Sequence, residues 1–471
     1  MSNLKKQNSS ASVSPHSAHQ ALCILATLAG ILGVNLSQTD ARASLADQPP
    51  PQRFTFTKIA TLGVSPNFGD FEFGQINNRG DLVFVSETAE CVDTGLGFSA
   101  CEGVFLLNQG RVSQIVTAGN PAPGGGSFAG AVSGPSALNQ GGDAAVALAL
   151  TPFTFPFGLN AGLYRYTSGS GTLSAVVVPG VTPVPGSSGI AFQGTDQGVS
   201  INNLGTIAFP GAFPISAGLP GTSSGVGIFT ADRSGSISRV IVPGDAAPGG
   251  ASFDDAQNTG INDLGDVVFE AHLAGAECVG GQPDPAFTLG CNATGVYLRQ
   301  ALSGNLIKIA QQGDLDPLGA PFRHAWGPVI NNSGQVVFVG DLTPPPANEQ
   351  SMGLYLYNGS SIVPVVRPGD ALPGGGTLKT VNDFVHSYGL NNRGDVSFSA
   401  VLSSGDQGVY VKSGSTIRLV AKTGTVMPGI GTFSAGGGGP SGPVINDRGQ
   451  VSFSATLASG DTVLLVATLS P

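Results

Sequence analysis

Charged residues are scarce in this sequence: Asp, Glu, Lys and Arg together make up 11% of its 471 residues, and acidic residues outnumber basic ones by 30 to 20. The formal net charge of −10 argues against a nucleic-acid partner, because such a partner favours a basic face. With five His and one Trp, the chain shows no pairing of a nucleophile with a base. The composition also lacks the high charge and low hydrophobicity of a disordered chain.

Cysteine is scarce too, with five residues in the chain. Cys23 lies in an apolar run, Ala21–Leu36, which follows two lysines and precedes the A-x-A sequence Ala41–Ala43. This order is typical of an export signal, so we expect residues 1–43 to form a signal peptide and residues 44–52 a short extended linker. An uncleaved membrane anchor is the alternative, although the run is shorter than the roughly 20 residues that a membrane span needs.

Glycine, by contrast, is abundant, and part of it belongs to an internal repeat. An Asn-x-x-Gly unit before an apolar strand occurs seven times, at intervals of 55 to 69 residues. Its Asn residues are Asn77, Asn139, Asn202, Asn262, Asn331, Asn391 and Asn446. The unit predicts a hairpin turn in which Gly takes the left-handed conformation and Asn bonds back to the turn. We therefore interpret these Asn as turn residues rather than as ligand-binding residues.

Each repeat predicts four strands: A before the Asn turn, B after it, C in a Gly-Val-Tyr segment such as Gly295–Arg299, and D before a Pro-Gly loop, as in Val240–Phe253. The last repeat ends after its C strand, Thr462–Val466, and the chain has an extra D-type strand at its start, Arg53–Gly63. Joining the two ends removes the free edges of an open array. We predict an all-β fold: one seven-bladed β-propeller of four-stranded blades over residues 53–471, closed by the N-terminal strand pairing with the C-terminal blade.

The chain resembles secreted bacterial tandem-repeat proteins that carry N-x-x-G-x-V-x-F and P-G-D-x-x-P-G-G motifs, here in Ile261–Phe269 and Pro243–Gly250. The resemblance extends over nearly all of Arg53–Leu469, and it implies export and a β-propeller fold. These proteins have no assigned activity, so the resemblance implies no catalytic residues. Two copies depart from the motifs: "LNQGGDAAVALAL" lacks the Phe, and "VVPGVTPVPG" lacks the Asp.

The four cysteines that follow the export signal form two pairs, each between strands B and C of its repeat. Two separate repeats carry such a pair in the same loop, which predicts disulfides Cys91–Cys101 and Cys278–Cys291 in an oxidising compartment. A four-cysteine metal site is the alternative, but the spacing within each pair is unlike C-x2-C. We expect no metal site and no cofactor, and we interpret Asp245, Asp314 and Asp370 of the Pro-Gly loops as turn caps rather than calcium ligands.

The B–C and D–A loops vary in length, whereas the Asn turns are uniform. Variable loops on a rigid scaffold usually carry binding sites, so we expect a site on this face and at the central mouth. Strand A and its approach supply the candidate ligand-binding residues: Trp326, His324, His386, Glu72, Asp70, Gln197, Gln257 and Asp255. The indole can stack on a ligand, and imidazole and carboxylate groups can exchange protons. The alternative is a water-filled channel lined by small and polar side chains.

These features favour a secreted or periplasmic propeller that binds an unidentified extracellular ligand or protein through its variable face. We expect a monomer that contacts neither nucleic acid nor, after removal of the signal, a membrane. Two alternatives remain open. One is a hydrolase or lyase acting on an extracellular polysaccharide at the channel mouth, for which the sequence assigns no catalytic residues. The other is a structural component of the cell surface.

Overall fold

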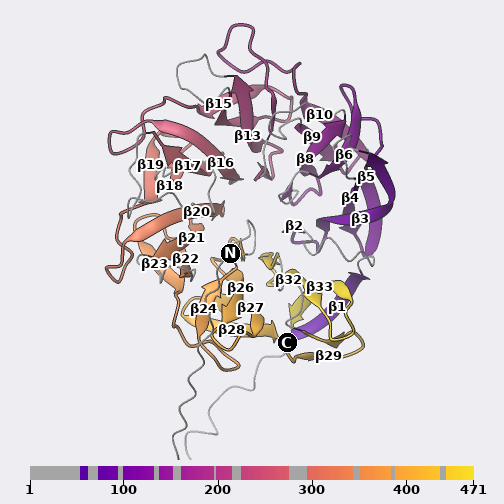
Figure 1. Ribbon diagram of the computed structural model, residues 1–471, viewed down its shortest axis with the longest axis vertical. Coiled ribbons are helices and arrows are strands. Elements are labelled where there is room, and N and C mark those ends of the chain that lie inside the picture. The colour runs from indigo at the N-terminus through magenta and orange to yellow at the C-terminus, as the bar shows by residue number, and fades with distance from the viewer. Residues whose placement is uncertain are drawn as a thin grey trace, which may run out of the picture. The chain divides into compact units, whose positions relative to one another are not determined.

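The computed structural model describes residues 54–61, 73–93, 99–131, 137–151, 161–195, 198–214, 224–274, 294–342, 351–382, 388–434 and 442–470. All of them belong to Arg53–Pro471, the second of the two units into which the chain divides; the first is Met1–Gln52. Every regular element of the described part is a β-strand. Seven antiparallel sheets form a ring (Figure 1), so this unit is the predicted seven-bladed β-propeller.

The blades follow one another in chain order, each built from strands A to D. Blade 1 has β2 (Phe73–Ile76), β3 (Leu82–Asp93), β4 (Ser99–Asn108) and β5 (Arg111–Thr117); blade 2 has β6 (Ser127–Ala131) with β7 (Ala137–Leu138), β8 (Ala144–Thr151), β9 (Ala161–Thr167) and β10 (Thr172–Val177); blade 3 has β11 (Gly194–Thr195) with β12 (Ser200–Ile201), β13 (Ile207–Pro214), β14 (Ser224–Ala231) and β15 (Ile237–Ile241). In blades 2 and 3 two short segments share the place of strand A.

The next three blades repeat this order. Blade 4 has β16 (Phe253–Ile261), β17 (Val267–Leu273), β18 (Thr294–Arg299) and β19 (Leu306–Gln311); blade 5 has β20 (Phe322–Ile330), β21 (Val336–Leu342), β22 (Met352–Tyr357) and β23 (Ile362–Val366); blade 6 has β24 (Leu378–Val381) with β25 (Tyr388–Leu390), β26 (Val396–Leu402), β27 (Gln407–Ser413) and β28 (Thr416–Lys422). A separate pair, β29 (Val426–Met427) and β30 (Gly431–Thr432), precedes blade 7.

Blade 7 closes the ring with strands from both ends of the unit. It contains β31 (Val444–Ile445), β32 (Val451–Thr456), β33 (Thr462–Leu469) and β1 (Phe54–Thr61). β1 pairs antiparallel with β33, from Phe54 opposite Leu469 to Thr61 opposite Val463, and the two strands lie side by side in Figure 1. The predicted closure by the N-terminal strand is therefore confirmed.

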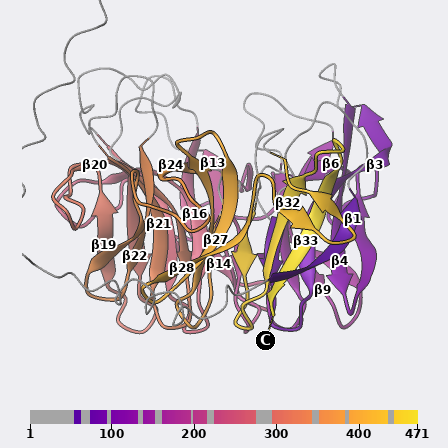
Figure 2. The same cartoon turned by 90° about the horizontal axis from the view of Figure 1, so that it is seen from below.

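Because each sheet is an antiparallel meander, its turns divide between the two faces of the ring (Figure 2). The A–B and C–D turns lie on one face, which we call the turn face. The B–C and D–A connections lie on the other, which we call the loop face. This division places the Asn turns at one end of strand A and the Pro-Gly loops at its other end.

The Asn-x-x-Gly units form the predicted turns. In blade 6, Asn391 Oδ1 accepts hydrogen bonds from the main-chain N–H groups of Arg393 and Asp395, at 3.0 and 2.8 Å. Gly394 has a φ of 82°, in the left-handed region that glycine enters without steric cost. The interpretation of these Asn as turn residues is confirmed, and their Oδ1 atoms are occupied by the turns themselves.

The same Asn side chains also join the blades to one another. Each Nδ2 donates to the main-chain carbonyl of the corresponding Asn in the next blade, and the last one returns to the first. The seven bonds run from Asn77 to Asn139 (3.3 Å), Asn139 to Asn202 (3.2 Å), Asn202 to Asn262 (2.9 Å), Asn262 to Asn331 (3.4 Å), Asn331 to Asn391 (3.0 Å), Asn391 to Asn446 (3.0 Å) and Asn446 to Asn77 (2.8 Å). We call this closed circuit the Asn ring.

A second circuit runs beside the Asn ring, through the residue that follows each Asn. The main-chain N–H of each of these residues donates to a side-chain oxygen of its counterpart in the next blade, at 2.7 to 2.9 Å. Its members are Asn78, Gln140, Asn203, Asp263, Asn332, Asn392 and Asp447. Blade-to-blade contacts on the turn face are therefore polar and directional. They fix the register of neighbouring blades, while apolar packing holds the blades together.

The carboxyl group of Asp395 gives the turn of blade 6 a pH dependence. Burial alone would raise the pKa of Asp395, but hydrogen bonds from Asn391 and Ser413 and the Arg393 charge bring it below its ordinary value. A carboxyl with a lowered folded-state pKa stabilises the fold above its unfolded pKa of about 3.9, and this contribution disappears as the pH falls through the folded-state pKa. As the pH falls below about 4, the free energy of unfolding of Asp395→Asn should therefore decrease less steeply than that of the wild type. Urea unfolding at a series of pH values measures this; an acid limb as steep as that of the wild type contradicts it.

The hydrophobic core lies between neighbouring blades, and the Gly-Val-Tyr segments explain part of its shape. In blade 4, Tyr297 is fully buried and packs edge-on against Phe253 at 5.0 Å between ring centroids. A Cβ on Gly295, two residues earlier, would lie 3.0 Å from that same tyrosine ring. Glycine is therefore required there by the ring that folds back over it, and Gly353 and Gly408 repeat the arrangement with Tyr355 and Tyr410.

Two buried tyrosines differ in one hydrogen bond. The Tyr164 hydroxyl has no hydrogen-bond partner, and burial raises its pKa to about 12. The Tyr297 hydroxyl donates to Gln311 Oε1 at 3.2 Å. We expect Tyr164→Phe to be neutral or stabilising, since it removes an unsatisfied buried hydroxyl, and Tyr297→Phe to cost about 1 kcal/mol. Chemical denaturation of the two variants tests this; a larger loss for Tyr164→Phe would show that its hydroxyl has a partner.

The first predicted disulfide is confirmed: Cys91 and Cys101 are bonded between β3 and β4 of blade 1. Cys278 and Cys291 lie outside the described residues, so their pairing stays a prediction. No helix that could span a membrane occurs in the described ranges.

Candidate functional site

Four of the eight predicted ligand-binding residues lie in the described part of the chain. Asp255 and Gln257 are on β16 of blade 4, and His324 and Trp326 are on β20 of blade 5. All four side chains are partly exposed. Asp70, Glu72, Gln197 and His386 lie outside the described residues, and their predicted role is untested.

His324 and Trp326 are neighbours near the loop-face end of β20. Their ring centroids are 6.3 Å apart, with the rings inclined at 68°. His324 Nδ1 lies 3.3 Å from Thr294 Oγ1 of blade 4. Across the sheet His324 stands opposite Asp341, which also lies 3.7 Å from Arg323 Nη1. Blade 5 thus supplies an aromatic surface, an imidazole and a carboxylate, and blade 4 adds the Thr294 hydroxyl.

Blade 4 carries the same pair of residue types in reversed order. Asp255 stands opposite His272 in the register of β16 and β17, where blade 5 has His324 opposite Asp341. His272 is in turn opposite Thr294, the residue that His324 contacts. One His and one Asp thus stand opposite each other in the sheet register of each of the two blades that meet at the junction of blades 4 and 5.

A buried carboxylate, Glu270, lies beneath this junction. Glu270 is 2% exposed and accepts hydrogen bonds from Gln257 Nε2 at 2.9 Å, Asn258 Nδ2 at 2.8 Å and the main-chain N–H of Gly327 in blade 5 at 3.2 Å. Asn258 has a φ of 50°, rare for a residue other than glycine, at a register shift between β16 and β17. Glu270 thus ties the backbone beside Trp326 to blade 4.

We call these eight residues the polar cluster: Asp255, Gln257, Glu270, His272, Thr294, His324, Trp326 and Asp341. Four of them, Glu270, His272, Thr294 and Asp341, were not among the ligand-binding residues predicted from the sequence. The repeat pattern did contain an indication for Glu270, because the corresponding strand-B positions of other repeats hold Val, Ala, Pro or Ser. No sequence pattern indicated Thr294, because it belongs to the polar cluster only through its contact with His324 of the next blade.

The other blades lack this cluster in the described part of the chain. Where blade 4 pairs Asp255 with His272, blade 2 pairs Gly130 with Ala149, blade 3 pairs Gly194 with Ala212, and blade 6 pairs Thr380 with Val401. Equivalent positions in a repeat face equivalent packing demands, which small or apolar residues meet. The polar residues of blades 4 and 5 are therefore an addition to the fold rather than a requirement of it.

The Pro-Gly loops of the loop face carry capping carboxylates. Asp245 Oδ2 accepts the main-chain N–H of Val242 at 2.9 Å, and Asp370 Oδ2 accepts that of Arg367 at 2.7 Å. Asp314 lies 2.7 Å from Lys308 Nζ. The geometry supports turn capping by Asp245 and Asp370. Among the described residues, no group of three His, Cys, Asp or Glu side chains is placed to hold a metal ion.

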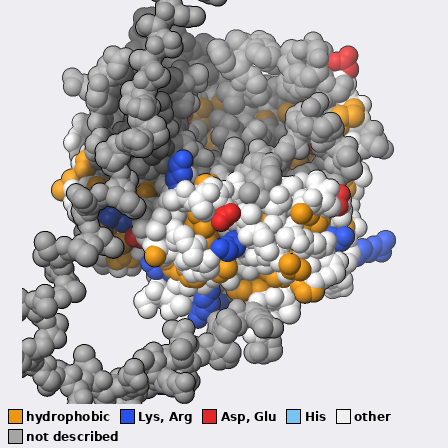
Figure 3. Space-filling model, turned by 60° about the horizontal axis from the view of Figure 1, so that its bottom comes forward, with side chains coloured by type: hydrophobic (Ala, Val, Ile, Leu, Met, Phe, Trp, Pro, Cys, Tyr) orange, Lys and Arg blue, Asp and Glu red, His pale blue; other side chains and the backbone are white. Residues whose placement is uncertain are grey.

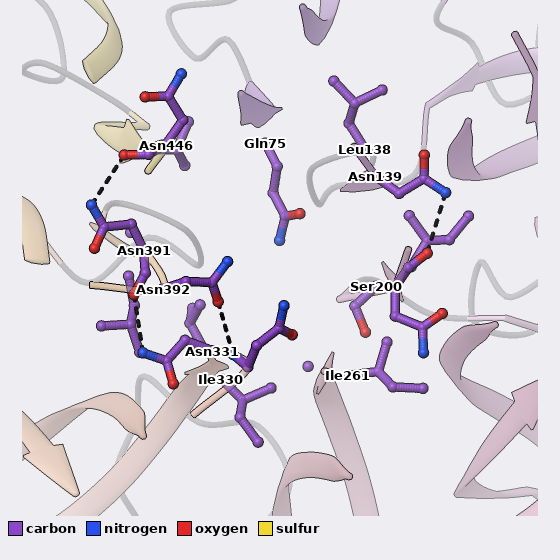
Figure 4. A pocket seen from close by; sticks show the side chains of 18 of the residues that line it. Gln75, Leu138, Asn139, Ser200, Ile261, Ile330, Asn331, Asn391, Asn392 and Asn446 are labelled. Atoms are coloured by element: carbon purple, nitrogen blue, oxygen red, sulfur yellow. Dashed lines mark hydrogen bonds between the residues drawn. The ribbon is translucent and has the colours of Figure 1, made fainter. Parts of the chain in front are cut away.

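A pocket of about 130 Å³ opens at the turn-face end of the ring centre (Figure 4). Its lining comes from the ends of the A strands and from the Asn turns, and it includes none of the polar cluster or of the eight predicted candidates. Gln75 extends towards its middle. The two features occupy opposite ends of β20, because His324 lies near its start and the pocket is lined by Pro328 to Asn332.

The described surface that Figure 3 shows is weakly charged. Figure 3 shows single basic, acidic and apolar side chains interspersed among other polar groups over the described area, in keeping with the low content of charged residues. This view shows no continuous charged area that would mark a binding face.

Comparison with known proteins gives a family. The model of a "Family of unknown function (DUF7453)" matches residues 58–290 and 285–463. No curated protein matches the chain in sequence.

Several solved structures are similar to this chain at low sequence identity. An oligogalacturonate lyase in complex with manganese is 15% identical; the match covers 89% of this chain and 97% of that chain, with a TM-score of 0.44. The β-propeller domain of the Trilobed protease from Pyrococcus furiosus is 11% identical, with 84% and 95% covered and a TM-score of 0.44. A puromycin-hydrolyzing peptidase of Mycobacterium tuberculosis is 12% identical, with 86% and 53% covered and a TM-score of 0.45. None of these likenesses bears on the activity of this chain.

Proposed function

Since the chain belongs to the DUF7453 family, whose function is unknown, we propose from its own residues that it is an exported, non-catalytic binding protein that holds a carbohydrate-like ligand at the polar cluster. The observation that carries the proposal is the asymmetry of the ring. Two adjacent blades place imidazole and carboxylate groups where the described parts of blades 2, 3 and 6 have small, apolar or hydroxyl side chains.

The chemistry of the cluster suits a carbohydrate. The partly exposed indole of Trp326, the only Trp of the chain, offers an apolar face against which a sugar ring can stack. His324, Thr294, Asp255 and Gln257 offer donors and acceptors for hydroxyl groups. A few polar groups beside an aromatic surface are typical of small-molecule sites.

The contacts that hold the polar cluster in place favour ligand binding, because they restrict the movement of its side chains. Glu270 joins Gln257 of blade 4 to the main chain of Gly327 in blade 5, and the side chain of Trp326 packs against the core between blades 5 and 6. Groups held by such contacts lose little freedom when a ligand binds, which favours affinity. Export is supported by the N-terminal segment and by the Cys91–Cys101 disulfide, a bond that persists in oxidising compartments.

Trp326→Ala is expected to weaken binding at least tenfold, because truncating a central aromatic contact commonly costs more than about 1.4 kcal/mol. A glycan array probed with the folded chain from residue 44 identifies the ligand, and titration calorimetry gives the affinities of the variants. Tyr357→Ala is the matched control: it removes a partly exposed aromatic ring from the turn-face end of blade 5, and it should bind as the wild type does.

Three outcomes contradict the proposal. A folded protein that binds no glycan above background favours a structural component of the cell surface. Full affinity in Trp326→Ala places the ligand elsewhere. Shortened glycan products released by the wild type, and lost in His324→Ala, replace the binding protein by an enzyme that uses the imidazole in proton transfer.

A further inference from the structure

The pocket at the turn-face end of the ring combines an apolar wall with a polar rim. The wall contains the residue before each turn Asn, an aliphatic side chain in all seven blades: Ile76, Leu138, Ile201, Ile261, Ile330, Leu390 and Ile445. The rim contains six residues of the second circuit: Gln140, Asn203, Asp263, Asn332, Asn392 and Asp447. Apolar and polar lining are thus separated along the ring axis.

Only two of the lining residues are charged, and both are acidic. Asp263 belongs to blade 4 and Asp447 to blade 7, so they lie three blades apart one way around the ring and four the other. No Lys, Arg or His is among the lining residues. Such a lining disfavours anions and attracts cations.

Both carboxylates are held in place by the rim amides. Asp263 accepts bonds from the main-chain N–H of Asn203 (2.8 Å) and from the Nδ2 groups of Asn203 (2.8 Å) and Asn332 (2.6 Å). Asp447 accepts the equivalent bonds from Asn392 (2.7 and 3.0 Å) and from the Nδ2 of Asn78 (2.7 Å). An ionised carboxylate has about four acceptor sites, so each keeps capacity for one more donor.

We infer that this pocket binds a small aliphatic amine, whose ammonium group bonds to a rim carboxylate while its carbon chain packs on the aliphatic wall. The inference is independent of the function proposed for the polar cluster. A cavity of about 130 Å³ is well below the roughly 300 Å³ of pockets for drug-sized ligands. A short chain therefore fits better than a polymer.

Other cations match the lining less well. A quaternary ammonium group is usually held by aromatic rings, whereas Tyr388 is the one aromatic residue of the lining and its hydroxyl donates to the Gly327 carbonyl. A bare divalent cation needs several oxygens within about 2.6 Å, and the two carboxylates come from blades on different sides of the ring. A primary ammonium group has three N–H donors for carboxylate and amide oxygens.

The presence of two carboxylates favours a diamine over a monoamine. An α,ω-diamine carries an ammonium group at each end at neutral pH, since alkylammonium pKa values lie near 10. It can meet Asp263 and Asp447 together, with its methylene chain across the aliphatic wall. The affinity should then depend on the number of methylene groups between the two ammonium groups of the diamine, which can be measured.

Titration calorimetry of the propeller with 1,4-diaminobutane, 1-aminobutane and 1,4-butanediol tests the inference. We expect binding in the order diamine, monoamine, diol, with no detectable heat for the diol, and weakening of diamine binding in high salt. Asp263→Asn and Asp447→Asn should each weaken the diamine about tenfold, and the double variant should abolish binding. These variants are expected to fold, because Asn occupies the same position in blades 1, 3, 5 and 6.

Asp370→Asn, a carboxylate of the loop face, is the control and should leave diamine binding unchanged. The inference is overturned if the folded wild type binds no amine, or if both rim variants bind the diamine as tightly as the wild type does. It is also overturned if Ca²⁺ displaces the diamine at equal concentration, since the pocket would then be a metal site.

Discussion

We expect removal of residues 1–61 to abolish cooperative unfolding of the propeller. Removal of residues 1–52 should leave the unfolding midpoint unchanged. The two truncations differ by little more than β1, the strand that completes blade 7. Thermal unfolding followed by circular dichroism, with size-exclusion chromatography for the state of assembly, measures both.

The expected loss is large because β1 contributes along its whole length. Seven of its residues have register partners on β33, and main-chain hydrogen bonds contribute about 0.5–1.5 kcal/mol each. Phe54 and Phe56 also pack against the core between blades 6 and 7. The sum is on the order of 5–10 kcal/mol, as large as the whole stability of many domains.

Loss of β1 also exposes the edge of β33 to solvent. An unpaired edge strand pairs readily with other chains, so the longer truncation should aggregate or form strand-exchanged oligomers. A monomer with an unchanged midpoint after removal of residues 1–61 would show that the ring does not depend on β1.

Asn391→Ala is expected to lower the free energy of unfolding by about 2–4 kcal/mol. The Asn391 side chain makes four hydrogen bonds: it accepts from the N–H groups of Arg393 and Asp395, and it donates to Asp395 Oδ2 at 2.9 Å and to the carbonyl of Asn446 at 3.0 Å. Asn391 is 3% exposed, so water cannot replace these partners without rearrangement of the turn.

Asn358→Ala is the matched control for this variant. Asn358 is an exposed turn residue whose Oδ1 accepts from the N–H groups of Ser360 and Ser361 at 3.1 and 3.0 Å, and its Nδ2 donates to Ser361 Oγ. Its loss should cost no more than about 1 kcal/mol. Equal effects of the two substitutions, in urea unfolding at pH 7, would show that the bond to the next blade contributes nothing.

The fold was predictable because its signals are local and repeated. Each Asn-x-x-Gly turn fixes one hairpin, and seven copies with an extra strand at the start require a closed ring of seven. The paired cysteines of the first repeat predicted a bond that the structure contains. In each case, residues close in sequence carry the information.

Contacts between repeats were not predictable in the same way. The sequence identifies Asn77 and Asn139 as turn residues, but only the packing of blade on blade brings the Nδ2 of one to the carbonyl of the other. The partners of Glu270 depend on a register shift at Asn258 and on the backbone of the next blade. The division of strand A into two segments in blades 2, 3 and 6 also had no counterpart in the repeat pattern.

The candidate site was predicted in part. The structure places His324 and Trp326 side by side, and it adds Thr294, Glu270, His272 and Asp341 from neighbouring strands. Trp326 also packs against the core between blades 5 and 6, a contact that its position in the repeat did not indicate. Ligand binding by these residues stays a prediction.

Closure of the ring requires β1 to be the outer strand of the last blade. Hydrogen exchange of the intact protein, followed by mass spectrometry of the peptide that spans Phe54–Thr61, tests it most directly. We expect slow exchange of the amides that face β33, comparable with that of the β33 peptide itself. Exchange of the whole peptide within seconds, at the rate of an unstructured chain, would contradict the closure of the ring and with it the two faces on which both proposed sites depend.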